Sequence, residues 1–164
     1  MDRVPLSLST HGLTLLQESE ALRLKAYKDT GGVWTIGWGT IRYPDGSQVQ
    51  EGDVCTREQA DYWKCMDLAW VQKAINSMVA VEINQKMFDA LCGLVYNIGE
   101  HAFHKSSLLR QLNQRNYKQA SLEFDKWVKD RVNGKLVTIQ GLVNRRDREQ
   151  ALFDEGVKEL AAKC

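Results

Sequence analysis

Apolar residues after residue 55 recur at three- and four-residue steps, which is the spacing of amphipathic helices. Thr56 and Gln59 have the spacing of a capping box, and helical periodicity continues from them to about Val79. Asn84 can cap a second helix that ends at Gly99 and is apolar on nearly every side, as expected for the buried centre of a helical lobe. Further helices are predicted at 106–113, 117–127 and 141–155, with a turn at 132–135 that belongs to a hairpin or an ordered loop.

The first 55 residues have a different pattern, in which short apolar runs alternate with glycines. Ser9 or Thr10 can cap a first helix. The run 33–38 predicts a strand, and 43–47 predicts a turn, because proline presets φ and Asp-Gly tolerates a positive φ. We expect this strand and the stretch near Gln48 to form a small antiparallel sheet that is too small to be stable alone.

These elements predict an α+β fold in one domain of 164 residues with two lobes. The small, sheet-containing lobe should cover about 12–55, and the helical lobe about 80–164, with the N-terminal helix placed to pack on the helical lobe. A connecting helix at about 56–79 would be ~30 Å long, which is enough to join two lobes.

Composition and charge are those of a soluble globular protein: 43% of the residues are hydrophobic, 26% are charged, and the net charge is +1. This charge does not indicate a nucleic acid or an anionic membrane as a partner. Arg145 and Arg146 stand beside Asp147 and Glu149, a mixture that predicts a solvated helix face. Residues 1–16 lack the apolar core of a signal peptide, and no segment has the roughly 18 apolar residues of a membrane span, so we expect a cytoplasmic protein.

The four cysteines, Cys55, Cys65, Cys92 and Cys164, form no Cys-x-x-Cys pair and have no histidine at metal-ligand spacing. A chain without an export signal usually keeps its thiols reduced, so free cysteines are predicted. Three histidines lack metal-binding spacing on one helix, and no metal is expected: they are His11, His101 and His104.

Candidate chemistry is concentrated in residues 18–40, ESEALRLKAYKDTGGVWTIGWGT. Glu20, Asp29 and Thr35 are spaced at intervals of nine and six residues, on a helix end, before a Gly-Gly turn and in the predicted strand. Two carboxylates on either side of a bond are what glycoside hydrolysis requires, since one protonates the leaving oxygen and the other activates water or attacks carbon. Each also has a structural alternative: a solvated helix end for Glu20, a turn cap for Asp29 that uses the backbone donors of Thr30 and Gly31, and strand formation for Thr35.

The stretch resembles the signature of the phage-type lysozymes and endolysins, glycoside hydrolase family 24. Its Glu, eight residues, Asp, five residues and Thr are followed by the Ile-Gly-x-Gly turn at 36–39. The resemblance covers about 12–152 and includes the segments 88–91, 96–99, 103–109 and 141–149. Two features depart from it: Thr40 stands where many members have histidine, and 41–54 replaces a shorter turn.

The resemblance implies a lysozyme-like fold without a cofactor. It implies that Glu20 is the general acid, and that Asp29 and Thr35 hold the attacking water. Either Arg145 or Arg146 would reach the Glu20 carboxylate, with Arg145 slightly favoured. By analogy, further sugar contacts are expected from Ile41, Tyr96 and Ser107.

By the same resemblance, the reaction is hydrolysis of the β-1,4 bond between N-acetylmuramic acid and N-acetylglucosamine in bacterial peptidoglycan, for host cell lysis. A monomer is expected that remains in the host cytoplasm until a membrane partner of the holin type releases it to the wall in the periplasm. Two alternatives stay open: a lytic transglycosylase, which uses one acid and no water, and a non-catalytic peptidoglycan-binding module.

Overall fold

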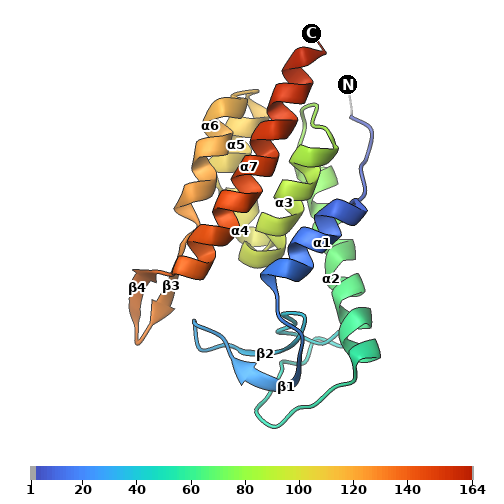
Figure 1. Cartoon of the computed structure of the whole chain (residues 1–164), viewed down its shortest axis with the longest axis vertical. Helices are drawn as coiled ribbons and strands as arrows, with labels where there is room; N and C mark the ends of the chain where they lie inside the picture. The colour runs from blue at the N-terminus through green and yellow to red at the C-terminus, as the bar shows by residue number, and fades with distance from the viewer. Residues whose placement is uncertain (1–2, 164) are drawn as a thin grey trace.

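The computed structural model describes residues 3–163, apart from the side chain of Ser19. It has the predicted α+β architecture, with a helical lobe and two small antiparallel sheets at one end of it (Figure 1). In chain order the helices and strands are α1 (Thr10–Ser19), β1 (Arg23–Lys28), β2 (Trp34–Gly37), α2 (Arg57–Met78), α3 (Gln85–Ile98), α4 (Glu100–Lys105), α5 (Ser107–Asn113), α6 (Tyr117–Glu123), β3 (Lys129–Val132), β4 (Lys135–Thr138) and α7 (Gln140–Ala162).

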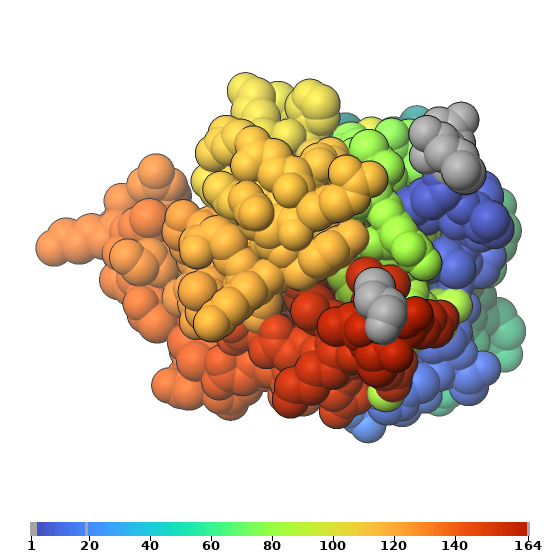
Figure 2. Space-filling model, turned by 90° about the horizontal axis from the view of Figure 1, so that it is seen from above, coloured from blue at the N-terminus to red at the C-terminus, as the bar shows by residue number. Residues whose placement is uncertain are grey.

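The central helix of the larger lobe is α3, and α7, α2 and α1 pack around it (Figure 1). Every residue from Met87 to Val95 is buried, which confirms the predicted buried centre. The core extends from α3 to Phe153 of α7 and to Leu108 and Leu112 of α5. Seen from above, α5 and α6 lie on one side of the molecule and the N-terminal part on the other (Figure 2).

The predicted caps begin helices α1, α2 and α3. Thr56 Oγ1 accepts from the backbone N–H of Gln59 at 3.1 Å, and the Gln59 side chain accepts from the Thr56 N–H at 2.9 Å. This capping box begins α2, which joins the small lobe to the helical lobe. Asn84 caps α3 by accepting from Met87 N at 3.2 Å.

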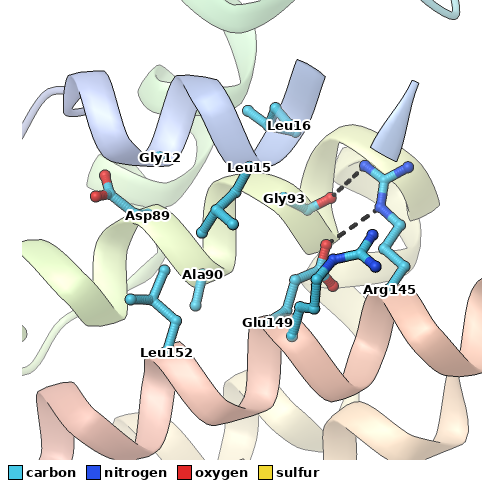
Figure 3. Close-up of a pocket in the computed structure, with 10 residues that line it drawn as sticks. Gly12, Leu15, Leu16, Asp89, Ala90, Gly93, Arg145, Glu149 and Leu152 are labelled. Atoms are coloured by element: carbon cyan, nitrogen blue, oxygen red, sulfur yellow. Dashed lines mark hydrogen bonds and ion pairs between the residues drawn. The ribbon is translucent and has the colours of Figure 1, made fainter. Parts of the chain in front are cut away.

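Helix α1 packs on α3 of the helical lobe. Its cap is Ser9, whose hydroxyl accepts from Gly12 N at 3.0 Å and donates to the Asp89 carboxylate of α3. A Cβ on Gly12 would lie 2.6 Å from Asp89 Cγ, so glycine allows the two helices to approach closely. Figure 3 shows this packing, with α1 lying over α3 and α7. We therefore propose that the small lobe begins at Glu20 and not at residue 12.

The sheet of the small lobe differs from the prediction in its pairing. Strand β2 lies where expected, but its antiparallel partner is β1, with Tyr27 opposite Thr35. The stretch near Gln48 forms only an isolated bridge, to Arg42. The sequence of β1 does not predict a strand, because Ala26 is its one buried position. The charged residues around Ala26 interrupt the alternation of apolar and polar residues that is typical of a strand.

Several other bounds differ from the prediction. Helix α4 was not predicted, and α7 is longer than 141–155 at both ends. The predicted helix at 117–127 ends at Glu123 and continues as a 3-10 turn. The turn predicted at 132–135 is confirmed and belongs to a hairpin, β3–β4, with positive φ at Asn133 and Gly134.

Within residues 3–163 the cysteines Cys55, Cys65 and Cys92 are free thiols, while Cys164 lies outside the described part of the chain. Burial raises the pKa of the Cys92 thiol, so the reactive thiolate is disfavoured there. Among the helices of residues 3–163, none is long and apolar enough to cross a membrane.

Both arginines at the start of α7 are buried, which corrects the prediction of a solvated face. Arg146 donates to Trp127 O at 2.8 Å and contacts Glu149 and Asn97. Arg145 Nε donates to Glu149 Oε2 at 3.2 Å (Figure 3). Helical periodicity alone could not distinguish this arrangement from a solvated face, because buried charges occur where partners reach them from other elements.

Replacing Glu149 should test this buried cluster. Glu149→Gln leaves two buried guanidinium groups without their shared negative charge, so we expect the free energy of unfolding to fall by about 3 kcal/mol. Urea unfolding followed by circular dichroism measures the change. Glu159→Gln, at an exposed ion pair of the same helix, is the matched control and should stay close to wild type. Equal stability of the two variants would contradict the structural importance of the cluster.

Candidate active site

A cleft of about 1380 Å³ separates the small lobe from the helical lobe. Six of the residues predicted for the site line it: Glu20, Asp29, Thr35, Ile41, Tyr96 and Arg145. A second hollow, beneath α1 (Figure 3), measures about 10 Å³ and is barely large enough for one water molecule, so it cannot hold a substrate. The lobe-separating cleft is therefore the candidate active site.

Glu20 occupies the C-cap of α1, where its backbone N–H donates to Gln17 O. Arg145 Nη1 donates to Glu20 Oε1 at 2.8 Å across 125 positions of sequence, and the Glu20 side chain is 18% exposed. The sequence left open whether Arg145 or Arg146 binds Glu20, and the structure shows that it is Arg145. Arg146 lies in the core and does not line the cleft. The ion pair orients a partly buried carboxyl group toward the cleft.

The backbone at Gly39 limits the position of the same carboxyl group. Gly39 has φ +93°, and a Cβ there would lie 2.8 Å from Glu20 Oε2. Both the backbone conformation and the space beside Glu20 therefore require glycine.

Asp29 has the turn-capping role that was its structural alternative, with one change of donor. Its Oδ1 accepts from Gly31 N at 2.9 Å and from Val33 N at 2.8 Å, so Val33 replaces the expected Thr30. Both hydrogen bonds end on Oδ1, which fixes the orientation of the carboxylate. Because Asp29 also lines the cleft, the turn and the site share this residue.

Thr35 lies in β2, is 4% exposed, and lines the cleft. Its Oγ1 donates to Val33 O at 2.9 Å, which leaves the lone pairs of the hydroxyl available as acceptors. Asp29 and Thr35 both contact the Val33 backbone, so one turn positions both side chains.

Among the predicted sugar contacts, Tyr96 and Ile41 line the cleft, and Ile41 is 52% exposed. The Tyr96 hydroxyl donates to Trp38 O at 2.9 Å, and burial raises the pKa of Tyr96 well above its ordinary value. The prediction for Ser107 is not supported by its position: Ser107 starts α5, accepts from Arg110, and does not line the cleft.

Lys64 is a residue of the site region that the prediction missed. It is 3% exposed on α2, and its Nζ donates to Trp38 O at 3.2 Å. Burial lowers the pKa of Lys64 to about 8, with Glu20 opposing the shift and Arg145 adding to it. Its position four residues from buried Ala60 was a signal that could have identified it, because a lysine in an apolar stripe is unusual.

The hairpin β3–β4 reaches across the mouth of the cleft, which the prediction also missed. Lys129, Asp130, Arg131 and Leu136 line the cleft. Thr30 Oγ1 donates to Asp130 Oδ2 at 3.1 Å, so the hairpin contacts the turn that follows Asp29. Two segments a hundred residues apart thereby meet in the lining of one cleft.

Thr40, one of the two departures from the resemblance, is fully buried. Its Oγ1 has no hydrogen-bond partner among the described residues. Among residues 3–163 there is also no cluster of three or more histidine, cysteine or acidic side chains placed to hold a metal ion.

Comparisons with known proteins match nearly the whole chain. The family model described as "Phage lysozyme" matches residues 17–149. The chain is 44% identical to the "Endolysin" of Acyrthosiphon pisum secondary endosymbiont phage 1, covering 90% of this chain and 97% of that protein. It is 45% identical to the "Endolysin" of Salmonella phage P22, covering 90% and 98%. The solved "Endolysin from Escherichia coli O157:H7 phage FAHEc1" is 37% identical with a TM-score of 0.81, covering 92% of this chain and 95% of that chain.

The contact between Gly39 and Glu20 can be separated from backbone strain by a matched pair of variants. Gly39→Ala and Gly46→Ala place an alanine at φ +93° and +91°, but nothing lies within 4 Å of a Cβ at Gly46. We expect Gly46→Ala to lower the free energy of unfolding by about 1 kcal/mol, and Gly39→Ala by at least about 2 kcal/mol, because Glu20 must also move. Chemical denaturation measures both, and equal losses would show that Glu20 does not limit the space at Gly39.

The buried charge of Lys64 predicts a dependence of stability on pH. Its pKa is about 8 in the folded protein and 10.5 ordinarily, so the unfolded chain binds more protons between these values. The cost of burying the charge is fully present below about pH 8 and disappears as the pH rises toward 10.5. The free energy of unfolding of wild type, relative to Lys64→Met, should therefore rise by about 2 kcal/mol from pH 7 to 9.5.

Urea unfolding at several pH values measures this difference. Lys73→Met changes an exposed lysine of the same helix and should differ from wild type by an amount that does not vary with pH. A flat difference for Lys64→Met as well would exclude the lowered pKa.

Proposed function

This chain belongs to the phage lysozyme family, and we propose that Glu20, Asp29 and Thr35 carry out its reaction in the cleft between the lobes. The protein is a glycoside hydrolase, a muramidase of the endolysin type. It hydrolyses the β-1,4 linkage between N-acetylmuramic acid and N-acetylglucosamine in bacterial peptidoglycan. The observation that most supports the assignment of residues is the Glu20–Arg145 ion pair inside the cleft that Asp29 and Thr35 also line.

Glu20 is proposed as the general acid that protonates the glycosidic oxygen. Of the two Glu20 carboxyl oxygens, Oε1 accepts from Arg145 at 2.8 Å, which orients the group, while Oε2 faces the Gly39 backbone and the cleft. A sugar chain that fills the cleft removes water from this partly buried group. Loss of solvent disfavours the charged form of a carboxyl group and so favours the form that can donate a proton.

Asp29 and Thr35 are proposed to hold the attacking water. The two backbone hydrogen bonds to Oδ1 fix the Asp29 carboxylate and leave Oδ2 to accept a proton of that water. Thr35 donates its own proton to Val33 O, so toward the water its hydroxyl acts as an acceptor. Attack by a held water on the side opposite the leaving group inverts the configuration at the sugar carbon.

The rim of the cleft is proposed to bind the glycan on both sides of the scissile bond. Ile41 offers an exposed apolar surface on the small lobe, and Trp63 and Trp70 line the cleft from α2. Sugar rings present apolar faces that pack on such side chains. Tyr96 contributes mainly its ring edge, because its hydroxyl is already bonded to Trp38 O.

The route to the wall and the assembly state belong to the same proposal. The enzyme acts as a monomer, since one chain supplies every residue named here for the cleft. It stays in the host cytoplasm until a membrane partner of the holin type releases it to the wall. Support for this route is the near full-length match to two phage proteins named Endolysin.

Glu20→Gln tests the assignment of the acid. Glutamine keeps the shape of the side chain but cannot donate the proton, so we expect the rate of release of reducing ends from purified peptidoglycan to fall at least about 100-fold. Glu18→Gln, at an exposed position of α1, is the matched control and should retain wild-type activity. Circular dichroism should show both variants folded.

The products of the wild-type digest test the reaction type. Mass spectrometry should find muropeptides with hydrated, reducing N-acetylmuramic acid ends. Mainly anhydro ends would indicate a transglycosylase, and binding without any cleavage would indicate a wall-binding module. If Glu20→Gln released reducing ends at the wild-type rate, Glu20 would not be the general acid.

A further inference from the structure

Lys64 is a charged residue in the buried stripe of α2. Ala60 and Val71 are fully buried on this stripe, Leu68 is 8% exposed, and Lys64 itself is 3% exposed. An ammonium group buried without partners would cost several kcal/mol. The contacts of Lys64 should therefore explain why a charged side chain is tolerated at this position.

Those contacts converge on the carbonyl group of Trp38. Lys64 Nζ donates to Trp38 O at 3.2 Å and lies 3.7 Å from the centre of the Tyr96 ring. The Tyr96 hydroxyl donates to the same oxygen at 2.9 Å. Trp38 is further held by its indole N–H, which donates to Asp61 Oδ1 at 2.8 Å. Side chains from α2 and α3 thus bind one carbonyl group of the small lobe.

The residue after this carbonyl is Gly39, whose backbone lies against Glu20. A Cβ at Gly39 would be 2.8 Å from Glu20 Oε2, while Arg145 binds Oε1 of the same group. A movement of the Trp38–Gly39 peptide would therefore change the space open to the Glu20 carboxyl group. Lys64 is connected to the proposed acid through one peptide unit.

Three charged groups and one aromatic ring surround Lys64. Glu20 follows α1 and Asp67 belongs to α2, and both act on Lys64 as negative charges, while Arg145 of α7 acts as a positive one. The Tyr96 ring of α3 faces the ammonium group with its electron-rich surface. The attraction that keeps Nζ at this place therefore depends on its positive charge.

We propose that Lys64 is a positioning residue for Glu20, which holds the Trp38–Gly39 peptide against the Glu20 carboxyl group and thereby sets the rate of the hydrolysis and its alkaline limit. This inference rests on the proposed function of Glu20. Because burial lowers the pKa of Lys64 to about 8, its charge is lost in a mildly alkaline solution. The neutral amine is no longer attracted by Glu20 and Asp67, so the peptide is held less firmly as the pH rises through that value.

The test compares wild type, Lys64→Met and Lys73→Met on solubilised peptidoglycan strands between pH 5.5 and 9.5. Methionine matches the length of the lysine chain but has no charge and no donor. We expect kcat of Lys64→Met at pH 6.5 to fall about tenfold, with KM within a factor of two, because the catalytic group is misplaced while the binding surface is kept. Wild type and Lys73→Met should lose activity as the pH passes about 8, and Lys64→Met should not show this loss.

A second variant separates positioning from simple packing. Tyr96→Phe removes the other donor to Trp38 O and keeps the ring under the ammonium group, so we expect a lower kcat and an unchanged loss of activity near pH 8. The proposal is wrong if Lys64→Met keeps the kcat of wild type. It is also wrong if kcat is lower but activity still decreases above about pH 8. If Lys64→Met does not fold, the pH profile of wild type decides: the proposal is wrong if wild-type activity does not decrease near pH 8.

A readout without turnover distinguishes this proposal from the proposed function. The ¹³C resonance of the Glu20 carboxyl group should shift in Lys64→Met and not in Lys73→Met. If Glu20→Gln remains active, the proposed role of Glu20 fails, whatever Lys64 does. If Glu20→Gln is inactive but the Glu20 resonance of Lys64→Met is that of wild type, the role of Lys64 fails alone.

Discussion

The three-way bonding of Arg145 is the interaction on which the rest of the site depends. Its Nε, Nη1 and Nη2 donate to Glu149, Glu20 and the carbonyl of Gly93, respectively. The guanidinium group is a planar fork with fixed donor directions, so these three bonds set the relative positions of α7, α3 and the end of α1. A lysine at this position could not replace it, because one ammonium on a flexible chain has no such geometry.

Close packing of α3 and α7 follows from the same contacts. A Cβ on Gly93 would lie 2.6 Å from Glu149 Oε2, so glycine is what allows the Glu149 carboxylate to lie against α3. Glu149 in turn binds Arg145 and Arg146, and both are buried. The charges are tolerated in the core because each has a partner. Arg145 extends this buried polar network to the lining of the cleft.

Much of the helical architecture and the family could be predicted from local sequence. Caps such as Thr56 and Asn84 act within four residues of themselves, so their effect is visible in the sequence. The sequence does not reveal strand β1, because one buried residue gives no periodic pattern. Ser107 is expected by analogy to contact the sugar, but it does not line the cleft. Lys64 was missed because the groups that make its burial tolerable come from other parts of the chain.

The sequence by itself determined most of the helices, the caps of α1 to α3, the turn of the β3–β4 hairpin and the candidate acid, carboxylate and hydroxyl. These depend on short-range hydrogen bonds, backbone preferences and a motif contained in residues 18–40. Only the tertiary structure decided which arginine binds Glu20, which strand pairs with β2, and that Lys64, Gly39 and the β3–β4 hairpin belong to the region of the cleft. The reason is physical: a buried charge or a contact across a cleft is stabilised by partners that lie tens to more than a hundred residues away, and their distance in space cannot be read from spacing along the chain.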